Sequence, residues 1–259
     1  MTMQWMTMFR KELIENWTNK KWIWVPIVMV LLTVMDPLSY YYLPEIIELT
    51  GGIPEGTVLE IPTLAPNEVV MMSIEQLNMF GVLVIALITM GTIAGERSSG
   101  ITEILLVKPI RYDHYVTAKW CSFLLLIWLA LFVGMIANWY YTNLLFGELN
   151  FVTMLQIVFF YGLWFTFVLT LSMFYNTLCK SPGMVLACTI VTIVVMSFIN
   201  MVIGHQLTMF PNQLSNHIGE FVTTEQITNE LTGTSIIIFV LIFILLFAAT
   251  FIFKRRELI

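Results

Sequence analysis

Side chains that could carry out acid–base or nucleophilic catalysis are sparse in this sequence, and they form no catalytic spacing. The chain contains no Gly-Lys pair, so the GxxxxGK loop that binds the phosphates of ATP is missing. His114, His205 and His217 are isolated from other metal-ligating residues, and no nucleophile elbow is present. We therefore predict that the chain is not an enzyme, holds no catalytic residue, metal or cofactor, and does not hydrolyse ATP by itself.

Polar residues inside long apolar runs are a second place where chemistry could occur, because such residues often mark a transport path. Asp36 is the only acidic one, and it lies near the outer end of its run, where its charge could simply reach water. Proton- or ion-coupled transport usually needs a buried titratable relay, which this chain lacks. A path with mostly neutral polar groups suits a hydrophobic or amphipathic cargo, and its candidate residues are Asp36, Asn138, Gln156, Asn176 and Asn200.

The most distinctive polar segment runs from Gly95 to Arg111, between two apolar runs. Gly100 permits a turn. After it, Ile101, Ile104 and Leu105 are spaced to form one apolar face of a short amphipathic helix, and Pro109 ends that helix. A passive connector needs neither the charged turn nor the apolar face, whereas a groove in a soluble partner could bind both. The candidate contact residues are Gly95, Glu96, Arg97, Ser99, Gly100, Ile101, Glu103, Ile104, Leu105, Lys108, Pro109 and Arg111.

The elements that carry this segment are expected to lie in a membrane. Of the 259 residues, 58% are hydrophobic and only 11% are charged, whereas soluble domains average about 25% charged residues. We predict an all-α integral membrane protein forming one transmembrane domain over residues 1–259. Six apolar runs are long enough, or nearly so, to cross the bilayer, at about residues 22–42, 74–94, 120–145, 152–178, 183–203 and 235–253.

The distribution of basic residues predicts the orientation. All 12 Lys and Arg residues lie before the first run, between the second and third, between the fourth and fifth, or after the sixth. The intervening loops carry acidic residues instead. Since Lys and Arg near spans mark the cytoplasmic side, both termini and residues 95–114 should be cytoplasmic. Residues 43–73 and 204–234 should form extracytoplasmic loops.

The first nineteen residues favour an interfacial helix that precedes the first span. Apolar side chains recur at helical spacing at Trp5, Met6, Phe9, Leu13 and Trp17. Such a helix would rest on the inner leaflet. In the outer loops, residues 66–68 favour a helix start that leads into the second span, and Ile218, Phe221, Val222 and Ile227 favour short amphipathic helices.

Part of the polar segment resembles a known family. Gly95-Glu96-Arg97-Ser98-Ser99-Gly100-Ile101-Thr102-Glu103, followed by Leu105-Leu106-Val107-Lys108-Pro109-Ile110-Arg111, is similar to the stretch after the second span of type 2 ABC exporter permeases. The layout of six spans with an amphipathic N-terminal helix also matches. The resemblance implies that residues 95–114 form a coupling segment, with Glu96 and Arg97 at a hinge and residues 101–108 inserted in a cleft of a separate cytoplasmic ATPase subunit. It also implies that ATP and Mg are bound by that partner, that a second permease copy or paralogue completes a dimer, and that the chain resides in a bacterial cell membrane.

Two functions from different classes are therefore consistent with the sequence. The first is the permease subunit of an ABC exporter, driven by ATP that the partner hydrolyses. The second is a membrane regulatory or anchoring module, which would bind a cytoplasmic ATPase or signalling protein at the same surface without moving a cargo. The sequence predicts no nucleic-acid partner, because the net charge is −5.

Overall fold

The computed structural model describes residues 2–49, 62–100, 111–204 and 206–256, and every regular element in these ranges is helical. The predicted all-α membrane fold is confirmed. In chain order the elements are α1 (Thr2–Thr18), α2 (Lys21–Tyr41), α3 (Leu43–Leu49), α4 (Pro66–Gln76), the π-helix η1 (Leu77–Gly81), α5 (Val82–Thr89), α6 (Ala94–Ser98), α8 (Tyr112–Leu145), α9 (Phe151–Leu178), α10 (Pro182–Ile203), the 3-10 helix η2 (Pro211–Gln213), α11 (Leu214–Thr224) and α12 (Asn229–Arg256).

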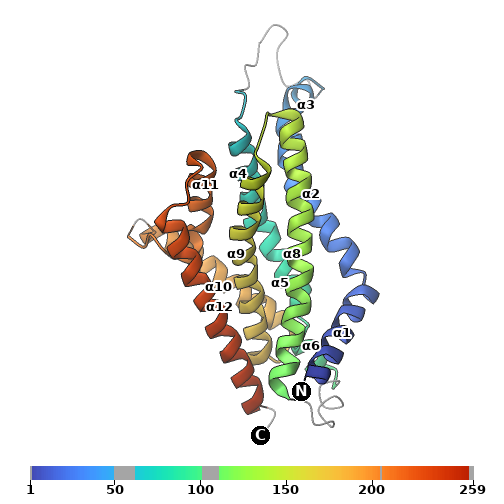
Figure 1. Ribbon diagram of the computed structural model, residues 1–259. Coiled ribbons are helices and arrows are strands. Elements are labelled where there is room, and N and C mark those ends of the chain that lie inside the picture. Colours follow the sequence, from blue (N-terminus) through green and yellow to red (C-terminus); the bar gives the residue numbers. More distant parts are fainter. Residues whose placement is uncertain (1, 50–61, 101–110, 205, 257–259) are drawn as a thin grey trace.

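Six of the described segments are long and apolar enough to cross a membrane: α2, the run Pro66–Ser98, α8, α9, α10 and α12. They form an elongated bundle in which α9 is the central helix (Figure 1). Helix α9 packs against α5, α8, α10, α11 and α12, so it is buried on most sides. In contrast, α10 leaves a broad apolar surface outside the bundle, including Val194, Phe198 and Met201.

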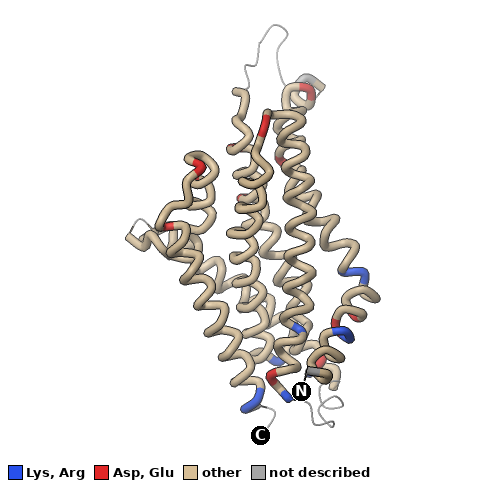
Figure 2. Tube along the Cα trace, in the orientation of Figure 1, with Lys and Arg blue, Asp and Glu red and all other residues tan. Residues whose placement is uncertain are grey.

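The two ends of the bundle differ in charge. We call the end that holds the N-terminus and the C-terminal end of α12 the basal end, and the opposite end the distal end (Figure 1). The described Lys and Arg residues all lie in the basal half, whereas Asp and Glu occur at both ends (Figure 2). The charge separation that the sequence shows along the chain is therefore a separation in space.

Helix α1 leads into α2 through a sharp turn at Lys20, which has a left-handed backbone with φ of 56°. Its predicted apolar stripe is only partly covered by the bundle, because Met6 and Trp17 stay largely exposed. The most buried side chains of α1 are Met8, Glu12 and Asn16, and Trp5 and Phe9 are half-buried beside them. The polar part of this inner face was not predicted, since the hydrophobic pattern locates only the side that suits lipid.

The second span is longer and less regular than the sequence suggests. It begins at Pro66, where the Glu68 side chain accepts a hydrogen bond from the Ala65 backbone N–H, as expected for a helix start. A π-helical turn at η1 interrupts it, and Gly81 permits the close approach of Phe165 from α9: a Cβ atom there would lie 2.6 Å from the Phe165 ring. At the basal end the helix breaks after Thr89 and resumes as α6.

Other boundaries differ in similar ways. Helix α8 already begins at Tyr112, so residues 112–114 belong to this long helix and not to the polar segment before it. In the last distal loop, the expected amphipathic helix is α11, which buries Ile218, Phe221 and Val222, whereas Ile227 lies outside it and is exposed.

Candidate functional site

The polar segment begins at a break in the second span, which we call its root. Asn176 of α9 forms hydrogen bonds with both sides of that break. Helix α5 ends at Thr89, and its backbone carbonyl accepts a hydrogen bond from Asn176 Nδ2 at 3.0 Å. On the other side, Asn176 Oδ1 accepts hydrogen bonds from the backbone N–H groups of Ile93 (3.1 Å) and Ala94 (3.2 Å). Asn176 is fully buried, so its amide replaces the water that these helix ends would otherwise need.

Glu96 lies one turn beyond this break and is buried among cationic side chains. Only 9% of Glu96 is exposed. Its Oε1 atom lies 2.8 Å from Lys119 Nζ of α8 and 3.2 Å from Lys11 Nζ of α1. The Tyr115 hydroxyl donates a hydrogen bond to the other carboxylate oxygen. Both oxygens of Glu96 are therefore bound, which is what a buried carboxylate requires.

The same lysine joins the N-terminal helix to this site. Lys119 is 1% exposed, and its ammonium group also lies 2.9 Å from Glu12 Oε1 of α1. We name Lys11, Glu12, Glu96, Tyr115 and Lys119 the basal cluster. Because its members come from α1, α6 and α8, the cluster fastens the root of the polar segment to the interfacial helix and to the third span.

Further polar contacts align α1 along α8. Trp5 Nε1 donates to Thr117 Oγ1 at 3.1 Å, and Asn16 Nδ2 donates to Ser122 Oγ at 3.3 Å. The contacts lie on both sides of the Glu12–Lys119 ion pair and follow the same direction along the two helices. They show that α1 meets α8 through polar groups, including the indole N–H of Trp5, as well as through apolar side chains.

Helix α12 completes the surroundings of the basal cluster. The Phe253 ring stacks on Tyr115 with centroids 5.2 Å apart, and the Arg97 guanidinium lies 5.7 Å from the centre of the Phe253 ring. Arg97 follows Glu96 directly. Two neighbouring residues of α6 thus contact α1, α8 and α12 together.

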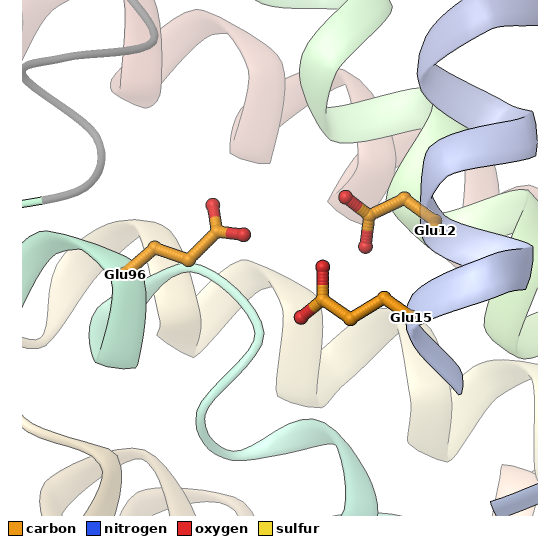
Figure 3. Close-up of side chains that lie close together, drawn as sticks. All are labelled: Glu12, Glu15 and Glu96. Atoms are coloured by element: carbon orange, nitrogen blue, oxygen red, sulfur yellow. The ribbon is translucent and has the colours of Figure 1, made fainter. Parts of the chain in front are cut away.

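Three carboxylates lie close enough in this region to resemble a metal site. The side chains of Glu12, Glu15 and Glu96 converge, with oxygen atoms within 4.8 Å of one another (Figure 3). However, Lys119 binds two of them, and Lys11 lies 3.1 Å from Glu15 and also binds the other two. The arrangement is an ion-pair network, because ammonium groups already contact each carboxylate.

The electrostatics of Lys11 agree with this description. Burial lowers the pKa of Lys11, but the negative charges of Glu12 and Glu96 and the hydrogen bond to Glu15 raise it more. The net pKa lies above the ordinary lysine value, so Lys11 remains charged at neutral pH.

The structure describes part of the predicted contact segment. Gly95, Glu96 and Arg97 belong to α6, where the Ser99 hydroxyl donates back to the Gly95 carbonyl at 3.0 Å. Gly100 has φ of 74°, which confirms the predicted turn. Arg111 precedes α8 and pairs with Asp113 at 2.7 Å. The remaining predicted contacts, Ile101, Glu103, Ile104, Leu105, Lys108 and Pro109, lie outside the described residues.

The predicted path residues lie in different parts of the bundle. Asn176 contacts the helix break, and buried Asn138 donates to Thr33 O (2.9 Å) and Ser73 Oγ (2.7 Å), which joins α8 to α2 and α4. Asp36 and Gln156 are half-buried on α2 and α9. Asn200 lines a polar cavity near the distal end of α10.

Sequence reasoning found Glu96 but not its partners. Lys119 lies within the long apolar helix α8, and a charged side chain there must find a counter-ion. Tyr115, one helical turn earlier, marks the same face. Lys119 and Tyr115 could therefore have been recognised from the sequence as candidate partners of an acidic residue. No sequence pattern near them indicates that Glu12 of α1 is one of their neighbours.

Comparison with known proteins agrees with the architecture. A family model described as ABC-2 family transporter protein matches residues 6–258. The chain belongs to the ABC-2 transporter family. It is also 31% identical over 193 residues to the "Uncharacterized transmembrane protein YxlG" of Bacillus subtilis (strain 168), covering 74% of this chain and 75% of that protein. The match to nearly the whole chain identifies this ABC-2 family protein as a multi-span membrane protein of the permease type.

The family match over residues 6–258 of this ABC-2 family protein includes the polar segment. The basal cluster therefore lies at the beginning of the segment that is expected to contact a partner.

Proposed function

We propose that this protein is the transmembrane permease subunit of an ABC exporter. A separate cytoplasmic ATPase subunit binds ATP and Mg, and its closure moves residues 95–111 to switch the spans between inward-facing and outward-facing states. The cargo is hydrophobic or amphipathic. A second permease copy or paralogue completes the working unit, and the exposed apolar surface of α10 is available to it or to lipid.

The observation that carries this proposal is the position of Glu96. Glu96 begins the polar segment and is bound to Lys119 of α8, which in turn is bound to Glu12 of α1. A displacement of the segment therefore cannot occur without moving these helices or breaking buried ion pairs, which costs about 3–5 kcal/mol. A docked ATPase could use this connection to transmit its motion.

The distribution of charge supports the proposed orientation in the cell membrane. The basal half holds the described Lys and Arg residues together with both ends of the described chain (Figure 2). By the positive-inside rule this half faces the cytoplasm, where an ATPase is located.

The test uses the protein together with an ABC ATPase of the same organism, chosen from a gene beside its own where one is present. We expect the two to co-purify, and we expect Glu96→Ala and Gly100→Pro to lower the permease-dependent ATPase rate roughly tenfold, the factor that about 1.4 kcal/mol produces. Glu45→Ala in α3 at the distal end is the control, because it removes an acidic side chain far from the basal cluster. Membrane insertion should be unchanged in all three variants.

Two results would contradict the proposal. One is an ATPase rate in both Glu96→Ala and Gly100→Pro equal to that of the unaltered protein. The other is a failure of reconstituted vesicles to move any amphipathic cargo while ATPase binding persists, which would indicate a regulatory module.

A further inference from the structure

A polar cavity of about 240 Å³ lies in the distal half, between α4 and η1 on one side and α9, α10, η2 and α11 on the other. Most of the residues in its wall are polar, although it is bordered by membrane-spanning helices. They include Glu75, Asn78, Ser197, Asn200, Asn212 and Ser215.

Some of these groups are paired with one another, and others are not. Asn78 accepts from the Tyr161 hydroxyl at 2.9 Å and donates to Ser215 Oγ at 2.7 Å. The carbonyl oxygens Asn200 Oδ1 and Asn212 Oδ1 are buried and have no hydrogen-bond partner among the described residues. Since buried polar atoms are nearly always paired, each of these acceptors needs a donor, which water or a bound polar group can supply.

The indole of Trp164 adds an aromatic wall to the polar cavity. Trp164 is 5% exposed, and its Nε1 atom is a further buried group without a partner in the described part of the chain. An aromatic ring attracts cations through its face, and an indole N–H can bind a hydroxyl or carbonyl oxygen.

An apolar groove of about 660 Å³ adjoins this cavity. It lies between α9, α10 and α12, and its lining includes Phe167, Leu171, Met196, Leu241 and Leu245. Pro211 lines both cavities. In addition, the Trp164 ring of the polar cavity stacks on Phe167 of the groove, with centroids 5.6 Å apart. The two spaces therefore share a boundary, one side polar and the other almost entirely apolar.

The charged residues around the two cavities indicate which kind of polar head group an amphipathic ligand would have there. Glu75 is the charged residue in the wall of the polar cavity, and neither cavity is lined by Lys or Arg. The described basic residues lie in the other half of the bundle (Figure 2). An anionic head group would meet one carboxylate and two unpaired acceptors, whereas a protonated amine would donate hydrogen bonds to the acceptors and be attracted by Glu75.

We propose that the two cavities form one binding site for an amphipathic molecule with a protonated amine head and an apolar tail. The head occupies the polar cavity, and the tail occupies the groove. As an assignment of cargo class, this inference rests on the proposed export function. As a binding site, it stands on the distal cavities alone.

The test uses the permease without any ATPase, in phosphatidylcholine nanodiscs. The probe is dodecylamine with a diazirine on its chain, and the matched control probe is dodecanol with the same diazirine. After illumination, mass spectrometry locates the labelled residues. We expect the amine to label the groove in preference to the alcohol, and unlabelled dodecylamine, but not dodecyl sulfate, to compete.

Variants separate the contributions of head and chain. Glu75→Gln should lower amine labelling of the groove roughly fivefold, as for an exposed charge pair, and Asn200→Leu roughly tenfold. Glu45→Gln, an acid at the distal end outside both cavities, should have no effect. Leu241→Trp should block labelling by filling the groove, whereas Phe243→Trp, on the exposed side of α12, should not.

Phosphatidylethanolamine added to the nanodiscs tells the two sources of an amine head apart. Competition by this lipid identifies a membrane lipid as the occupant, and its absence identifies a free amphiphile. The proposal is overturned if the amine and the alcohol label the groove equally, or if neither Glu75→Gln nor Asn200→Leu changes labelling while both variants keep the unfolding temperature of the parent. Such a failure would leave the coupling experiment on Glu96 unaffected.

Discussion

The ammonium nitrogen of Lys119 lies 2.8 Å from the carboxylate of Glu96, and both side chains are buried. One residue belongs to the third span and the other to the root of the polar segment. A buried ion pair adds little net stability, because both charges lose their hydration. Its consequence is geometric: Glu96 cannot leave Lys119 without exposing or stranding a charge.

Removing Lys119 should therefore destabilise the protein strongly. Lys119→Met leaves the carboxylates of Glu12 and Glu96 buried without their shared ammonium group, and we expect a loss of about 3–5 kcal/mol in the free energy of unfolding. Chemical unfolding in detergent measures this loss. The control is Arg111→Gln, which breaks an exposed ion pair with Asp113 and should cost at most about 1 kcal/mol. Equal losses for the two variants would contradict the buried network.

Asn176 should affect coupling as well as stability. Asn176→Leu leaves backbone groups of Thr89, Ile93 and Ala94 without a partner, at about 1–3 kcal/mol for each buried group left unsatisfied. We expect a lower unfolding temperature and a lower permease-dependent ATPase rate per folded molecule, because the break before α6 loses its defined geometry.

The matched control for Asn176 is Asn143→Leu. Asn143 also binds backbone groups, at Trp139 and Leu149, but near the distal end. This variant should lower the unfolding temperature and leave the ATPase rate per folded molecule unchanged. A loss of the ATPase rate in the control equal to that in Asn176→Leu would mean that the effect is general instability.

The proposed orientation predicts which side of the membrane each exposed residue reaches. In a background without Cys121, Cys179 and Cys188, Thr18→Cys on α1 should react with a membrane-impermeant maleimide only after cells are opened. Thr224→Cys on α11 should react in intact cells, since α11 lies toward the distal end. The cysteine-free background is the blank. Reaction of both sites from one side would rule out the orientation.

Lys11 predicts a defined pH dependence for the attachment of α1. Its pKa is raised in the folded state, so its contribution is fully present below the unfolded lysine pKa of about 10.4 and is lost as pH rises through the folded value. The difference in unfolding temperature between the parent and Lys11→Gln should thus be constant from pH 6 to pH 9 and should shrink only above about pH 10. A difference that shrinks on acidification within that range would show that Lys11 is not the responsible group.

Much of the architecture follows from local properties of the sequence. Hydropathy locates the spans because the cost of transferring a side chain into lipid depends mainly on that side chain, and the arrangement of Lys and Arg divides the loops into two groups. The turn at Gly100 and the helix start near Glu68 could be predicted for the same reason, since a few neighbouring residues determine turns and helix starts. Glu96 was recognisable as a candidate through its segment.

Only the tertiary structure determines the contacts between helices that are distant in sequence. The sequence marks Glu12, Glu96 and Lys119 as charged, but an ion pair depends on which helix faces are adjacent, and the hydrophobic pattern of α1 indicates its lipid side and not the polar side that faces α8. From the sequence, Asn176 is only a polar residue in a span, whereas three hydrogen bonds in the structure show that it holds the end of α5 and the start of α6. The physical reason is that burial and pairing of polar groups are set by packing, which no local pattern contains.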